Sequence, residues 1–242
     1  MAQNVMQPDL RRLNARYEGD GAGALRVALS GALGQIAMVS SFGADSAVLL
    51  HMVAQIDRDT PVLFIDTLML FEETLAYQRE LAETLGLSDL RVIRPSREAL
   101  FQGDSDNLLH LSDTDSCCDL RKTRPLEQAL QGFDGWITGR KRFQSGERAA
   151  IDLFEHDSAT GHLKVNPLAG WKAADLAAYM DTHALPRHPL VATKGYPSIG
   201  CAPCTGPVAP GEDPRAGRWR GQDKNECGIH IVDGRVIRRQ AS

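Results

Sequence analysis

Apolar and polar positions along the chain predict strands that alternate with helices. Short continuous apolar runs indicate buried strands, and segments whose apolar residues recur every three or four positions indicate amphipathic helices. The predicted strands begin at Ile36 and span 61–67 and 90–96, and the predicted helices span 48–56 and 71–87, the second closed by Gly86. This alternation predicts an α/β fold with a mostly parallel sheet and helices on both faces. Such sheets bind ligands beyond the carboxyl ends of their strands.

The second half of the chain continues the pattern more weakly. Residues 103–116 are acidic and rich in turn formers, which predicts a surface excursion. Residues 117–130 predict a helix, which Pro125 kinks or restarts. Two further strands are predicted at 134–142 and 164–168, and an amphipathic helix at 171–185. Prolines and glycines crowd the rest, so we divide the chain into an α/β domain at 1–186 and an irregular segment at 187–242.

Composition and charge narrow the kinds of function. Of the 242 residues, 43% are hydrophobic and 24% are charged, as in globular proteins, and the net charge is −4. This charge argues against a nucleic-acid partner, because affinity for a phosphate backbone needs neutralising Lys and Arg. No apolar run reaches the roughly 18 to 20 residues that span a bilayer, and the N-terminus lacks a signal-peptide pattern, so we expect a cytoplasmic protein without a membrane partner. The oligomeric state stays open, with a homo-oligomer as one option.

A loop of small residues follows the first predicted strand. It contains Ser41, Phe42, Gly43, Asp45 and Ser46 and leads into a helix. Backbone N–H groups at such a helix start, together with the helix dipole, form a site for an anion. The dipole contributes only about 0.3 to 2 kcal/mol, so other groups must help to hold a nucleotide. The alternative is an ordinary turn in which Asp45 or Ser46 caps the helix.

Four of the five cysteines form two close pairs. Cys117 and Cys118 are adjacent, and Cys201 and Cys204 form a CxxC pair. In a reducing compartment such pairs more often bind metal or do redox work than form structural disulfides. Zinc usually takes ligands with two to four residues between them, whereas a 4Fe-4S cluster places its cysteines on different irons, which favours the cluster. A thioredoxin-like redox pair and buried inert thiols are the alternatives.

The fifth cysteine, Cys227, stands alone near the carboxyl end. A free thiol with a pKa of about 8.5 is mostly protonated at neutral pH, so an inert buried thiol is one interpretation. Gly228 would let a ligand approach the backbone, however, and Lys224 and His230 could stabilise a thiolate. These neighbours favour a nucleophile at Cys227.

Three of these segments resemble one family. The loop resembles the S-G-G-x-D-S loop of ATP pyrophosphatase-like enzymes, with Phe42 in place of the first glycine, and more closely the loop of the phosphoadenylyl-sulfate and adenylyl-sulfate reductases. The CC pair followed by CxxC resembles the iron-sulfur branch of that family, and ECGIH at 226–230 resembles its nucleophile motif. The resemblance implies a Rossmann-like fold similar to the adenine nucleotide alpha hydrolases, with nucleotide binding in 1–186 and the CxxC and catalytic tail in 187–242. It also implies one 4Fe-4S cluster per chain.

The resemblance further implies which residues bind the substrate. They are Ser41, Phe42, Gly43, Asp45, Ser46, Phe64, Asp66, Thr67, Lys122, Arg140, Arg215, Arg218 and His230. Phe64, Asp66 and Thr67 fall where the family lines its adenosine pocket, and the arginines suit phosphate and sulfate oxygens. We expect Lys122 to link cluster and substrate electrostatically. His230 is expected to be an acid, a substrate ligand or a polar residue at a helix end.

The implied reaction is the reduction of adenosine 5'-phosphosulfate to sulfite and AMP, a step of sulfate assimilation and cysteine biosynthesis. Cys227 would attack sulfur and become an S-sulfocysteine, and thioredoxin or a similar dithiol protein would then release sulfite. The nearest rival interpretation has 3'-phosphoadenylyl sulfate as substrate, although family enzymes for that substrate usually lack the four cluster cysteines. A second rival is an ATP-dependent tRNA sulfurtransferase, and a third is a zinc-holding nucleotide sensor without chemistry.

Overall fold

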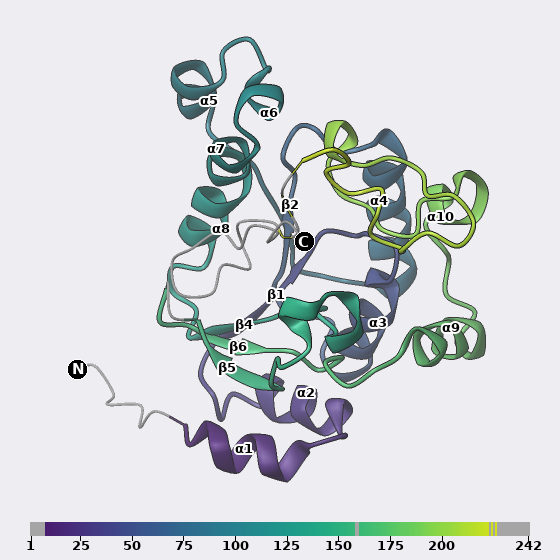
Figure 1. Cartoon of the computed structure of the whole chain (residues 1–242). Coiled ribbons are helices and arrows are strands. Elements are labelled where there is room, and N and C mark those ends of the chain that lie inside the picture. Colours follow the sequence, from purple (N-terminus) through teal and green to yellow (C-terminus); the bar gives the residue numbers. More distant parts are fainter. Residues whose placement is uncertain (1–7, 158–159, 223, 225, 227–242) are drawn as a thin grey trace.

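The computed structural model describes residues 8–157, 160–222, 224 and 226. Among these residues, six strands form one sheet in the order β3-β2-β1-β4-β6-β5. The strands are β1 (Ile36–Ser40), β2 (Val62–Ile65), β3 (Leu90–Ile93), β4 (Gly135–Ile137), β5 (Phe154–His156) and β6 (Leu163–Val165). All neighbours in this sheet pair in parallel except β5 and β6. The predicted α/β fold with a mostly parallel sheet is therefore confirmed (Figure 1).

The described helices range from single turns to fourteen residues. They are α1 (Leu10–Tyr17), α2 (Gly21–Leu29), α3 (Ser46–Ile56), α4 (Glu72–Leu85), α5 (Arg97–Gly103), α6 (Leu109–Ser112), α7 (Thr114–Cys118), α8 (Arg124–Ala129), α9 (Ala173–Thr182) and α10 (Pro189–Lys194). A π-helical turn (Asp119–Thr123) joins α7 to α8, and 3-10 turns span Arg142–Gln144, Gly146–Arg148 and Ala202–Cys204. As predicted, α4 ends at Gly86, whose φ of 65° suits glycine.

Alternate residues of the strands enter two separate hydrophobic clusters. Met38 and Phe64 belong to the larger cluster, which includes buried residues of α2, α3, α4 and α9. Ala37 and Leu63 belong to the smaller cluster, with buried Leu126 of α8. Because successive side chains of a strand point to opposite faces, the two clusters cover the two faces of the sheet. Figure 1 accordingly shows α8 on the opposite side of the sheet from α3 and α4.

Some helices and strands of the structure were not predicted from the sequence. α1 and α2 precede the first strand, and β5 adds an antiparallel edge to the sheet. α10 lies within the segment expected to be irregular, where Pro189 begins the helix and Gly195 ends it with φ of 70°. The acidic excursion carries α6 and α7, which Figure 1 shows above the sheet. In the described ranges, no helix combines the length and the apolar character that a membrane crossing needs.

Candidate functional site

A cavity of about 290 Å³ opens at the carboxyl ends of β1, β2 and β4. β2 lies on one side of β1 and β4 on the other, so the strand order reverses at β1. Doubly wound sheets bind ligands where the order reverses. The cavity is lined by the loop after β1, by residues 138–141 after β4, by residues 197–201 and by parts of 213–219. Segments far apart in the sequence therefore build one site.

The loop after β1 places Ser41, Gly43, Asp45 and Ser46 in the cavity wall. α3 begins at Ser46, and Asp45 makes no side-chain capping bond to the helix. The Asp45 carboxylate instead accepts a hydrogen bond from Lys141 Nζ at 3.0 Å. Burial lowers the pKa of Lys141, and the Asp45 charge opposes that shift. Asp45 therefore occupies the N-cap position of α3, as the alternative expected, but its side chain forms an ion pair in the cavity wall and does not cap the helix.

The three residues expected to line an adenosine pocket lie in different surroundings. Thr67 lines the cavity. The Phe64 side chain is buried in the larger hydrophobic cluster, where it packs edge to face on Phe42 at a centroid distance of 5.2 Å. Asp66 is buried and accepts a hydrogen bond from Arg94 Nε at 2.9 Å. Of these side chains, only Thr67 is part of the cavity wall described here.

Basic side chains gather around the cavity. Of the described residues, those that line it are Lys122, Arg140, Lys141, Arg148, Arg215 and Arg218. Arg148 was not among the predicted binding residues. Several cations around a partly enclosed space create a positive potential that attracts an anion. The cavity is thus suited to a negatively charged ligand.

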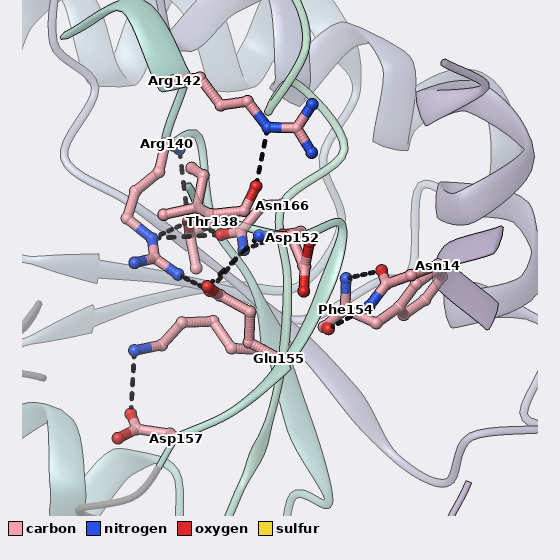
Figure 2. Close-up of polar contacts among 11 residues, drawn as sticks. Asn14, Thr138, Arg140, Arg142, Asp152, Phe154, Glu155, Asp157 and Asn166 are labelled. Carbon is pink, nitrogen blue, oxygen red and sulfur yellow. Dashed lines mark hydrogen bonds and ion pairs between the residues drawn. The ribbon is translucent and has the colours of Figure 1, made fainter. Parts of the chain in front are cut away.

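Arg140 is fixed by a buried polar network between β4, β5 and β6 (Figure 2). Its guanidinium donates to Glu155 Oε2 through Nη2, and to Asn166 Oδ1 through Nε at 3.2 Å. Asn166 also accepts from Thr138 Oγ1 at 2.9 Å and donates to the Glu155 carboxylate at 2.8 Å. Burial lowers the pKa of Arg140, although the Glu155 charge opposes the shift. These hydrogen bonds engage the Nε and Nη2 edge of the Arg140 guanidinium and fix the orientation of the side chain.

Arg121 and Lys122, the two basic residues that follow Cys117 and Cys118, have different surroundings. Lys122 lines the cavity, whereas the Arg121 side chain is buried in the protein interior. Arg121 forms a salt bridge with Asp104 at 2.6 Å and donates to the backbone oxygen of Thr67 at 3.0 Å. It also donates to Asn107 Oδ1 at 2.8 Å. Arg121 therefore ties the excursion and the end of β2 to the segment that carries Cys117 and Cys118.

The fold brings the two cysteine pairs together. Cys117 and Cys118 end α7, and Cys201 pairs with Leu70 in an isolated bridge close to the end of β2. Burial raises the pKa of Cys117 to about 11, and Cys118 and Cys201 add to the shift. Burial also raises the pKa of Cys204 to about 12, which the other three thiols reinforce and Lys122 opposes. The four sulfurs are thus close enough to repel one another as thiolates.

These thiols do not form a single-ion site. In the described part of the chain, no three Cys, His, Asp or Glu side chains are arranged to hold one metal ion. The donor set nevertheless consists of cysteines from both pairs, and Thr67 Oγ1 lies 3.2 Å from Cys201 Sγ. Four thiolates spread over several metal atoms are the ligand set of a 4Fe-4S cluster. The residues present therefore fit a cluster better than a lone zinc ion.

Two described residues before Cys227 connect the chain end to the site. Lys224 Nζ donates to Asp115 Oδ1 at 2.6 Å and lies 3.4 Å from Cys118 Sγ. Glu226 accepts hydrogen bonds from Arg148 Nε at 2.7 Å and Nη2 at 2.5 Å. Sequence reasoning missed Arg148 and Glu226 as site residues, although the position of Glu226 directly before Cys227 was a signal. Cys227 and His230 lie outside the described residues.

Comparisons with known proteins identify relatives of this chain. Residues 35–207 match the family described as "Phosphoadenosine phosphosulfate reductase domain". The "Adenosine 5'-phosphosulfate reductase" of Mesorhizobium japonicum is 55% identical over 86% of this chain and 81% of its own length. The protein of the same name from a Chelativorans species is 55% identical over 82% of this chain and 80% of its own length. A solved phosphoadenylyl-sulfate reductase from Candida auris, a phosphate complex, superposes with a TM-score of 0.71 at 26% identity, over 86% of this chain and 100% of that one.

Proposed function

Because the chain belongs to the phosphoadenosine phosphosulfate reductase family, we propose that it reduces adenosine 5'-phosphosulfate to sulfite and AMP. The observation that carries the proposal is that four cysteines meet beside a cavity lined by basic side chains. Lys122 belongs to both, because it lines the cavity and acts electrostatically on Cys204. A cationic cavity beside a group of thiolates suits an anionic substrate whose sulfur is to be reduced.

The substrate's anhydride is held by the loop at 41–46 and by the arginines of the cavity. The Cys227 thiolate attacks sulfur, the bond between sulfur and the phosphate oxygen breaks, and AMP leaves with that bond's electron pair. Cys227 is left as an S-sulfocysteine. A dithiol protein such as thioredoxin then attacks the Cys227 sulfur, sulfite leaves, and the second thiol resolves the mixed disulfide. The two reducing electrons come from the partner, so one catalytic cysteine suffices.

Cys117, Cys118, Cys201 and Cys204 are proposed as the ligands of one 4Fe-4S cluster. Support comes from the donor set, which consists of thiols alone and does not have the arrangement of a single-ion site. When bound, the cluster supplies negative charge next to the substrate site. Lys122 balances that charge and orients the substrate's sulfate. The described thiols form no disulfide, which suits the reducing cytoplasm that we propose as the compartment.

The second candidate is 3'-phosphoadenylyl sulfate as substrate. The solved Candida auris protein carries that name, at 26% identity. The two relatives at 55% identity are both named for the substrate without the 3'-phosphate, which favours adenosine 5'-phosphosulfate. The four grouped cysteines favour it as well.

Mass spectrometry of anaerobically purified protein tests the proposal. Wild type and Cys227→Ser are each mixed with either nucleotide in the absence of a thiol reductant. With adenosine 5'-phosphosulfate we expect a gain of about 80 Da on the Cys227 peptide, the mass of an SO3 group, with one AMP released per adduct; an adduct with the 3'-phosphorylated nucleotide would release adenosine 3',5'-bisphosphate. Cys227→Ser serves as the matched control and should gain nothing. A protein that forms no adduct with either nucleotide would contradict the proposed reaction.

A further inference from the structure

The residue directly before Cys227 is held in the basic cavity by two arginines. We propose that the Glu226 carboxylate occupies the site of a substrate anion, so that substrate must displace Glu226 from Arg148 and Arg215 in order to bind. The inference rests on the proposed function. It assigns Glu226 a positioning role: the acid holds the segment before Cys227 in the cavity, and anion binding releases it.

The contacts of Glu226 are those of an anion in a built site. Arg148 binds both carboxylate oxygens, Oε1 through Nε at 2.7 Å and Oε2 through Nη2 at 2.5 Å. Arg215 Nη2 lies 3.6 Å from Oε1, and Ser145 Oγ is 3.3 Å from the same oxygen. The Glu226 side chain is 8% exposed. Arginine binds carboxylate, phosphate and sulfate through the same two-pronged geometry, so Glu226 and a sulfonucleotide would compete for the same donors.

Glu226 differs from the other acids that pair with cations of the cavity in the part of the chain that carries it. Arg140 is paired with Glu155 of β5, and Lys141 is paired with Asp45 at the start of α3. Both of these acids belong to the α/β region. Glu226, in contrast, comes from the segment that continues into Cys227. Its displacement changes the position of that segment and leaves the other two ion pairs intact.

The contacts of Lys224 limit how far Glu226 can move when it is displaced. Its ammonium is buried, with the side chain 4% exposed, and it is bound to Asp115 and to the backbone oxygen of Thr114. These partners belong to α7, which also carries Cys118. Two residues of extended chain reach at most about 7 Å, so Glu226 leaves Arg148 only within a short radius of Lys224. Glu226 therefore stays close to the cavity when it leaves Arg148.

Competition predicts that removing the charge of Glu226 strengthens anion binding. Glu226→Gln keeps the size of the side chain but loses the charge-assisted bonds to Arg148. Because hydrogen bonds between charged groups are stronger than those in which one partner is neutral, we expect about a tenfold decrease in the dissociation constant of an anion. The matched control is Glu212→Gln, because Glu212 pairs with Arg220 on the surface. The control should bind anions as the wild type does.

The experiment measures binding of two probes, inorganic sulfate and AMP, to the full-length wild type and to both variants by isothermal titration calorimetry. Tighter sulfate binding by Glu226→Gln alone supports the inference. Sulfate affinity that is unchanged or weaker in Glu226→Gln overturns it, whatever AMP does, because competition requires that sulfate binds more tightly once the acid no longer holds the arginines. If sulfate binds more tightly but no protein binds AMP, the inference stands and the proposed nucleotide function fails.

Discussion

Between pH 7.5 and pH 5.0 the fold should lose stability because His188 is neutral in the native structure. His188 precedes α10 and is 0% exposed. Its Nδ1 accepts a hydrogen bond from the backbone N–H of Leu190 at 3.2 Å, and its Nε2 lies 3.0 Å from Thr74 Oγ1. A proton on Nδ1 would face the N–H of Leu190. Burial lowers the pKa of His188 from 6.5 to about 4, and the Glu73 charge opposes this only in part.

The sign and size of the effect follow from these two pKa values. Below its ordinary pKa of 6.5, the histidine of the unfolded chain takes up a proton, whereas the native histidine stays neutral down to about pH 4. The unfolded state then binds more protons, so the free energy of unfolding falls as the pH falls from 6.5 to 4. At pH 5.0 the loss from this one residue is about 2 kcal/mol. In a chain of this size that corresponds to a decrease of about 4–8 °C in melting temperature.

Thermal unfolding of wild type and His188→Gln at pH 7.5 and pH 5.0 measures the effect. Both proteins contain the same cysteines and the same other titrating groups, so the difference between their pH dependences isolates His188. We expect the wild type to lose about 4–8 °C more than the variant on acidification. His156→Gln, which replaces an exposed histidine of β5, controls for the loss of an imidazole. Equal losses in wild type and His188→Gln would refute the reasoning.

Three further perturbations test the packing and the site. Gly21→Ala places a Cβ 1.9 Å from the backbone oxygen of Pro167 and should cost about 1–3 kcal/mol in urea unfolding, whereas Gly170→Ala, with no atom within 4 Å, should cost less than about 0.5 kcal/mol. Asp104→Asn leaves the Arg121 charge buried and should cost about 3 kcal/mol in the same assay; a smaller loss than Gly170→Ala would contradict the buried ion pair. Lys122→Ala should lower kcat/KM about tenfold or more without changing the visible absorbance of the proposed 4Fe-4S cluster, and unchanged turnover would refute its electrostatic role.

The order of strands and helices was predictable because the central strands are buried on both faces. Each strand appears in the sequence as an apolar run, and the apolar residues of the intervening helices recur every three or four positions. β5 was not predictable, because three residues carry no period and the strand exists through its pairing of Phe154 with Val165. α2 was missed because two of its residues are glycines, which disfavour a helix. The burial of Leu25 in the larger cluster outweighs that preference.

The site was predictable where it rests on local motifs and was not where it rests on distant pairs. Cys117 and Cys201 were assigned from their close partners in sequence, and the structure places them near each other. The pairing of Arg148 with Glu226 spans 78 positions, so no spacing rule indicates it. The packing of the Phe64 side chain in the larger hydrophobic cluster depends on the direction of the β2 side chains and is visible only in three dimensions.

The π-helical turn at 119–123 places one residue more in a helical turn than α geometry holds. A side chain advances about 100° around an α-helix with each residue, so the extra residue rotates α8 relative to the cysteines of α7 by roughly that angle. A relative with one residue fewer between Cys118 and Pro125 would lose this π-helical turn. It would also turn Arg121 away from Asp104, or the cysteines away from Cys201. In this stretch of the sequence, the number of residues therefore determines the orientation of the cysteines and of Arg121 as much as the identity of those residues does.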